Sequence, residues 1–299
     1  MFKHRSRDPD APRICPAQTS VFAGVNKSIA QGILTRIAFA LMAAAAFPAC
    51  LEAAECTAKS GARRVPLLEL YTSEGCDSCP PADRWVSSLP ARGLSTGHIV
   101  ALGFHVDYWN DLGWKDSFAR PEFSARQRAA SRRNRASVVY TPQVLLNGRD
   151  YRRGVFKDTL ADDIAAIGRS GPRARISLGA TFGTSGTVSI RGTAYVDDPA
   201  ERTEARAFLA LYENRLASDI QAGENRGKRL HHDVVVRVLA GPFPFGRDGQ
   251  AAFSQRLALD ARWKSPNLGF AAFVQNERTG DVLQALAMTH CNNRERGRG

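Results

Sequence analysis

The sequence predicts a mixed α/β sheet flanked by helices, followed by an antiparallel β-sandwich. In the first half, apolar segments of strand length alternate with segments of helical composition in the order β-α-β-α-β-β-α, which places helices on the faces of a mixed sheet. In the second half, apolar and polar residues alternate within short segments that turn residues separate. The composition changes near Ser170, so we expect the two domains at residues 55–170 and 171–291.

The elements of the first half follow from local patterns. His98–Val106 is a continuous apolar run, which is typical of a buried strand. Asn147-Gly148 is a two-residue hairpin signal between two extended segments. Further strands are expected at Val65–Thr72, Val138–Leu146 and Arg149–Arg153, and helices at Ala82–Leu89, Pro121–Arg135 and Phe156–Ile167.

The second half contains a series of strand-like segments in which apolar and polar residues alternate. They are expected at Ala174–Phe182, Thr187–Val196, Arg206–Leu216, Asp233–Leu239, Ala251–Leu259, Gly269–Gln275 and Val282–Thr289. Short segments of this kind, separated by Gly, Pro, Asn and Asp, favour an antiparallel sandwich.

Residues 1–54 have the pattern of an export signal. Arg36 precedes the apolar run Ile37–Phe47, and small residues follow it, as in a cleaved signal sequence. The run is shorter than the roughly 20 apolar residues that a spanning helix needs. We therefore expect a periplasmic or secreted mature protein, and lipidation at Cys50 is the less favoured alternative. Residues 292–299 are expected to form a disordered tail.

The chain is basic, with a formal net charge of +12. A basic surface suits peripheral contact with an anionic envelope surface. The arginine cluster from Arg126 to Arg135 has the composition of a solvated helix face. Nucleic-acid binding is not expected, because no recognised motif accompanies the charge. No organic cofactor is expected either, because dinucleotide and phosphate-loop motifs are missing from the sequence.

Four cysteines follow the predicted leader: Cys56, Cys76, Cys79 and Cys291. An even number of cysteines in an oxidising compartment favours disulfide pairing. The close pair is the redox candidate, which leaves Cys56 and Cys291 for a structural bridge between the two ends of the mature chain. That bridge is a hypothesis, and two unpaired thiols are the alternative.

The motif Cys76-Asp77-Ser78-Cys79 follows an apolar strand and precedes a helix. A thiol at Cys76 would face backbone N–H groups and the positive end of a helix dipole, which both stabilise a thiolate, although Asp77 opposes it. Cys79 is close enough to attack a mixed disulfide formed at Cys76 and release the product. The alternatives are an inert disulfide and a metal site, but a four-Cys zinc site needs a second close pair.

His105 ends the second predicted strand and allows another interpretation of the cysteines. Together with Cys76 and Cys79 it would offer a Cu(I) site, since thiolates and an imidazole suit that ion. A packed histidine at the strand end is the alternative. The aromatic residues around the following loop are expected either to line a groove for a peptide substrate or to pack in the core; they are Tyr108, Trp109, Trp114 and Phe118.

The densest polar group of the second half is Gly223–Lys228 with the residues His231, His232 and Asp233. Neighbouring side chains of a strand point to opposite faces, so the two histidines cannot both bind one metal if the strand has begun there. We expect a loop that leads into a strand, and a binding role is the alternative.

Several of these segments resemble a family of exported bacterial proteins of unknown function with thioredoxin-like domains. The resemblance lies in Glu69–Asp83, Phe104–Trp109, Leu112–Trp114, Tyr140–Gln143, Gly223–Lys228, and His232 with Val235–Arg237. It covers both halves of the chain and implies that the mixed sheet is thioredoxin-like. It implies no substrate, because the family has no settled activity.

The resemblance also implies roles for particular residues. In thioredoxin-like proteins the first cysteine of the motif is the nucleophile, the second resolves the intermediate, and the proline before the hairpin is cis. These roles fall on Cys76, Cys79 and Pro142. The Asp-Ser dipeptide between the cysteines differs from the Gly-Pro or Pro-His of well-known oxidoreductases, so the direction of electron flow is not implied.

Glu69 is a further candidate, because a carboxylate in the middle of an apolar strand is costly to bury without a partner. Thioredoxins use a buried acid on this strand to take a proton from the resolving thiol, and Glu69, seven residues before Cys76, is the candidate for this role. The role needs a carboxyl group with a raised pKa. An exposed or salt-bridged residue on an edge strand is the alternative.

Together, these features predict an exported thiol–disulfide oxidoreductase-like protein that acts on a protein or peptide client and needs a redox partner protein. The alternatives are a non-enzymatic binding module, with Cu(I) on Cys76, Cys79 and His105, and a protein whose disulfide is purely structural.

Overall fold

The computed structural model describes residues 55–152, 157–183 and 186–289. The predicted leader, the predicted tail and Cys291 lie outside the described residues, so the hypothesis of a Cys56–Cys291 bridge stays a prediction. Within the described ranges, no helix combines the length and the apolar character that crossing a bilayer requires.

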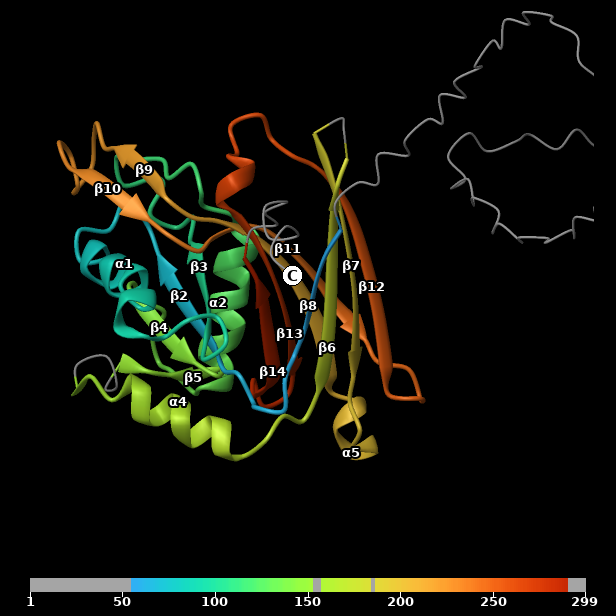
Figure 1. Cartoon of the computed structure of the whole chain (residues 1–299). Helices are drawn as coiled ribbons and strands as arrows, with labels where there is room; N and C mark the ends of the chain where they lie inside the picture. The colour runs from blue at the N-terminus through green and yellow to red at the C-terminus, as the bar shows by residue number, and fades with distance from the viewer. Residues whose placement is uncertain (1–54, 153–156, 184–185, 290–299) are drawn as a thin grey trace, which may run out of the picture. The chain divides into compact units, whose positions relative to one another are not determined.

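Figure 1 shows the elements and their labels. The helices are α1 (Pro80–Ser87), α2 (Pro121–Arg133), α4 (Leu160–Arg169) and α5 (Pro199–Arg202), and 3₁₀ turns lie at Pro90–Arg92 and Ser265–Asn267. The strands are β1 (Glu55–Lys59), β2 (Leu67–Thr72), β3 (Val100–His105), β4 (Gln143–Leu146), β5 (Arg149–Asp150), β6 (Arg175–Phe182), β7 (Thr187–Tyr195), β8 (Ala205–Glu213), β9 (Leu216–Asp219), β10 (Arg229–His232), β11 (Val235–Pro244), β12 (Gln250–Ala258), β13 (Leu268–Asn276) and β14 (Val282–Met288).

An eight-stranded mixed sheet runs in the order β14-β13-β8-β11-β3-β2-β4-β5. β3 pairs in parallel with β2 on one side and with β11 on the other, and the remaining neighbours pair antiparallel. The pairing of β3 with β11, where Val235 lies opposite Gly103, joins strands from the two halves of the sequence. The sheet thus crosses the position near residue 170 where composition predicted a domain boundary.

A four-stranded antiparallel sheet in the order β1-β6-β7-β12 packs over part of the larger sheet. The core between them joins Leu178 and Ile190 of the small sheet to Leu209 and Phe270 of the large one. The predicted fold class is confirmed: a mixed sheet with parallel strands flanked by helices, and an antiparallel sheet. All seven strands predicted for the second half form, but β6, β7 and β12 join one sheet while β8, β11, β13 and β14 join the other.

Helices cover both faces of the strands β2 and β3. Leu70 of β2 packs in one apolar cluster with Val86 of α1 and Ile164 of α4. The neighbouring Tyr71 belongs to a second cluster with Phe123 of α2. Because consecutive side chains of a strand point to opposite faces, α2 lies across the sheet from α1 and α4.

A buried ion pair ties α2 to the sheet. Arg126 donates to the two carboxylate oxygens of Glu69 at 2.8 and 3.0 Å, and the hydroxyl of Tyr71 donates to the same carboxylate at 2.6 Å. The guanidinium lies 5.2 and 5.1 Å from the ring centroids of Phe208 and Phe273. Burial disfavours the charge of Arg126, but the attraction of Glu69 outweighs it and raises the pKa of the guanidinium above its ordinary value.

Replacing Arg126 by leucine should leave Glu69 buried without a counter-charge. The expected loss in the free energy of unfolding is about 3–5 kcal/mol, the usual cost of removing one partner of a buried pair. Urea denaturation of the purified chain measures it, with Arg128→Leu on an exposed position of the same helix as the control. Equal losses in the two variants would contradict the account of this ion pair.

Candidate functional site

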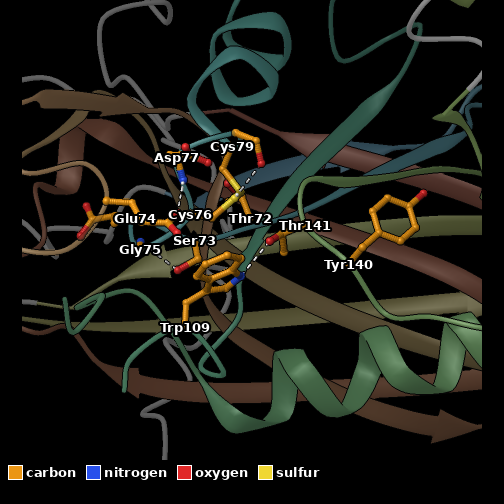
Figure 2. The surroundings of a disulfide bond; sticks show 12 residues. Thr72, Ser73, Glu74, Gly75, Cys76, Asp77, Cys79, Trp109, Tyr140 and Thr141 are labelled. Carbon is orange, nitrogen blue, oxygen red and sulfur yellow. Dashed lines mark hydrogen bonds between the residues drawn. A yellow bond between two sulfur atoms is a disulfide. The ribbon is translucent and has the colours of Figure 1, made fainter. Parts of the chain in front are cut away.

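Cys76 and Cys79 form a disulfide at the corner between β2 and α1. Cys79 is the residue before the first turn of α1, which begins at Pro80, and its carbonyl accepts the backbone N–H of Asp83 at 3.2 Å. The side chain of Ser78 lies 3.3 Å from the sulfur of Cys76. The pair therefore occupies the place that the sequence predicted, between a strand and the start of a helix (Figure 2).

The Thr141-Pro142 peptide bond is cis, as the family resemblance implied. Pro142 and Thr141 line a pocket of about 490 Å³ together with Ser78, Val144 and Arg152. Since Ser78 lies between the two cysteines, this pocket lies beside the disulfide.

Trp109 packs against the loop that carries the disulfide. Its indole N–H donates to the hydroxyl of Thr141 at 2.8 Å, and a Cβ on Gly75 would come within 3.1 Å of the Cβ of Trp109 (Figure 2). Trp114 contacts the same loop through its indole N–H, which donates to the carboxylate of Glu74 at 2.9 Å. Trp109 also packs against the apolar core, which is one of its two predicted roles, whereas Trp114 contacts the cysteine loop through Glu74.

A second clamp on the cysteine loop comes from the turn between β9 and β10. The side-chain amide of Asn225 donates to the backbone carbonyls of Glu74 and Cys76 at 2.8 and 2.9 Å. The carboxylate of Glu224 accepts the backbone N–H of Asp77 at 3.1 Å. With these contacts in place the relative exposure of both cysteines is 0%.

A buried group of two histidines and three carboxylates contacts the cysteine loop at Glu74. Its first part joins His105, at the end of β3, to Asp116 through a hydrogen bond of 2.6 Å from Nδ1. Asp116 also accepts the backbone N–H groups of Glu74 and Phe118. Burial disfavours the charge of Asp116, but His105 and these N–H groups outweigh it and hold the pKa of the carboxyl below its ordinary value.

His232, the last residue of β10, forms the second part of this group. Its Nε2 lies 3.4 Å from Glu74 and its Nδ1 lies 3.6 Å from Asp83, and its ring meets that of His105 edge-on at a centroid distance of 4.9 Å. Burial disfavours a charge on His232, but the two carboxylates outweigh it and raise its pKa to about 10. Phe118 packs edge-on against both imidazoles.

The structure separates some residues that the sequence analysis grouped together. Glu69 lies on the face of β2 covered by α2, where its carboxylate is bound by Arg126 and Tyr71. It is therefore salt-bridged, though on a central strand rather than an edge strand, and its role as proton acceptor stays a prediction. In the structure, His105 is hydrogen-bonded to the carboxylate of Asp116, and the sulfur atoms of Cys76 and Cys79 are bonded to each other. These three residues therefore do not form the alternative Cu(I) site in this structure.

Three buried carboxylates of the site were not predicted individually from the sequence: Glu74, Asp83 and Asp116. Glu74 and Asp83 lie within Glu69–Asp83, the segment that resembles the family, and that position is the sequence feature that could have identified them. His232 was noticed only as part of a polar loop. His231 and His232 both belong to β10. His231 is exposed and His232 is buried, so the two side chains point to opposite faces of the strand, as expected for neighbouring residues.

The comparison with curated proteins gives no match. Among solved structures, protein AGR_C_4864 from Agrobacterium tumefaciens is 26% identical with a TM-score of 0.54, over 78% of this chain and 98% of that one. HBP35 of Porphyromonas gingivalis is 14% identical with a TM-score of 0.60, over 77% of this chain and 76% of that one, which shows a shared fold. Residues 67–275 match the family model of the proteins of unknown function called DUF1223, and the chain belongs to that family.

Proposed function

We propose that this chain is a thiol–disulfide oxidoreductase in which Cys76 is the nucleophile and Cys79 the resolving cysteine. The observation that carries the proposal is the disulfide at the start of α1, beside a pocket lined by Ser78 and the cis-linked Pro142. A client disulfide held in that pocket would lie against the motif.

The proposed exchange takes place in two displacement steps. The thiolate of reduced Cys76 attacks one sulfur of the client disulfide, a mixed disulfide forms, and the other client sulfur leaves as a thiolate that takes up a proton. Cys79 then loses its proton and attacks the sulfur of Cys76, which releases the client as a dithiol and leaves the Cys76–Cys79 disulfide. The reverse sequence would oxidise a client, and a separate redox partner protein returns the pair to its starting state.

The client is proposed to be an extended peptide segment of an exported protein. The pocket beside the disulfide has Val144 and Pro142 as apolar lining and Arg152 as a basic rim. Such a lining favours an apolar segment with a neighbouring acidic residue. Export itself is proposed from the signal pattern of residues 1–54. Contact with an anionic envelope surface is proposed from the net charge, which is +12 for the full sequence and +9 (35 basic minus 26 acidic residues) once residues 1–54 are removed.

A Cys79→Ser variant should accumulate the mixed disulfide, because the resolving thiol is lost while the nucleophile stays. After reduction, the purified variant is mixed with oxidised glutathione, and peptide mass mapping should find one glutathione on Cys76. The matched control is Cys76→Ser, in which Cys79 should react at least about tenfold more slowly, because only a favourably placed thiol has the depressed pKa of a nucleophile. Absence of the adduct on Cys76 would contradict the proposed exchange.

The clamp on the cysteine loop should limit access to the sulfur atoms. An Asn225→Ala variant loses two hydrogen bonds to that loop, each with a net value of about 0.5–1.5 kcal/mol. If the loop must open before exchange, the rate of disulfide reduction by dithiothreitol should rise about tenfold. Arg226→Ala, at the exposed neighbouring position, is the control and should leave the rate unchanged. An unchanged rate in the Asn225 variant would show that this clamp does not govern access.

A further inference from the structure

Three residues of this buried group are arranged like the ligands of a metal ion. Asp83 of α1, His105 of β3 and His232 of β10 each offer one ligand atom, and these atoms lie within 4.8 Å of one another. The relative exposures of the three residues are 7%, 1% and 2%. They come from three separate elements, so the group exists only in the folded chain.

A neighbour binds one polar atom of His105 and one of Asp83, and one nitrogen of His232 faces a carboxylate. Nδ1 of His105 is bound to Asp116 at 2.6 Å, which leaves Nε2 for a ligand. Oδ2 of Asp83 accepts the hydroxyl of Thr72 at 3.0 Å, which leaves Oδ1. Nε2 of His232 faces Glu74 at 3.4 Å, which leaves Nδ1 toward Asp83. Histidine ligands of metals are held in this way by a carboxylate on the second nitrogen.

Unpaired polar atoms in the same group point to a ligand independently. Both ring nitrogens of His232 and Oε1 of Glu74 are buried without a hydrogen-bond partner, because the separations of 3.4 and 3.6 Å are too long for good hydrogen bonds. A buried polar atom without a partner costs about 1–3 kcal/mol. A cation between His232 and Asp83 would bind one of these nitrogens and allow the other to approach Glu74.

The charge balance favours a cation as well. The group contains the carboxylates of Glu74, Asp83 and Asp116, and none of the ion pairs that Arg or Lys forms among the described residues involves them. A divalent cation bound among them would compensate two of these negative charges.

We propose that Asp83, His105 and His232 form a zinc site. Two imidazoles and one carboxylate are a ligand set typical of Zn²⁺ sites in which a water molecule takes the fourth position. The site lies near the redox pair, since Asp83 is one helical turn from Cys79 and Glu74 is two residues before Cys76. The ion would fix α1, β3 and β10 to one another and hold the cysteine loop between them. The proposal does not depend on exchange activity.

Zinc binding is tested on the full purified chain with the disulfide intact, after removal of metals with a chelator. Titration with Zn²⁺ alone, followed by calorimetry and by elemental analysis after desalting, should give one bound ion per chain. Asp83→Asn and His232→Ala should lose this stoichiometric binding, and Glu74→Gln should weaken it about 10- to 100-fold as a residue that supports a ligand. His231→Ala, at the exposed position next to His232, is the matched control and should keep it.

A Cys76→Ser/Cys79→Ser double variant separates this site from a thiolate site. The double variant should still bind one Zn²⁺ although it can carry out no exchange, so failure of the zinc proposal and failure of the proposed function give different results. No bound zinc in the wild-type chain, or binding that the double variant loses, would overturn the proposal. If a variant at Asp83 or His232 does not fold, the zinc stoichiometry of the wild-type chain still tests the proposal.

Discussion

The parallel contact between β3 and β11 is the constraint on which the site depends. The N–H of Gly103 donates to the carbonyl of Val234 at 2.8 Å, just before β11 begins. Val234 has a φ of 53°, a left-handed conformation that a β-branched residue rarely adopts, and the side chain of Asn214 accepts its N–H at 2.9 Å. This turn places His232 against His105, and it places the β9–β10 turn over the cysteine loop.

A conformation of this kind costs about 1–3 kcal/mol and persists where the surroundings hold it. Here this conformation lies between β10, which carries His232, and β11, which belongs to the eight-stranded sheet. The second half of the chain therefore does more than pack beside the first. It supplies Asn225, Glu224 and His232, which contact Cys76, Asp77 and Glu74 of the cysteine loop.

Strands of the second half were predictable where apolar and polar residues alternate along the sequence. β7 and β12 show that alternation and were found at nearly their observed bounds. The assignment of strands to sheets was not predictable, because it depends on pairings between distant segments such as Val235 with Gly103. β1 was not predicted, because its five residues contain no run or alternation of large apolar side chains. β9 and β10 were not predicted, because their polar composition is typical of a loop.

The site was predictable only as far as local motifs reach. The place of Cys76 and Cys79 between strand and helix follows from neighbouring residues, whereas the group around His232 requires contacts over more than a hundred residues. Glu69 shows the limit clearly. The need of its carboxylate for a partner was recognised, but the partner is Arg126, which the sequence placed on a solvated helix face. A guanidinium under aromatic rings cannot be told from a surface arginine by composition.

The central claim of this account is that Cys76 and Cys79 form an exchange-active pair rather than a permanent brace. The most direct test is the reduction potential of the pair, measured by equilibrating the purified mature chain with glutathione or dithiothreitol buffers and quantifying the two thiols. The account predicts a potential above about −300 mV, within the range of dithiols that exchange with cellular partners. A potential well below about −300 mV would identify a structural disulfide and contradict the account.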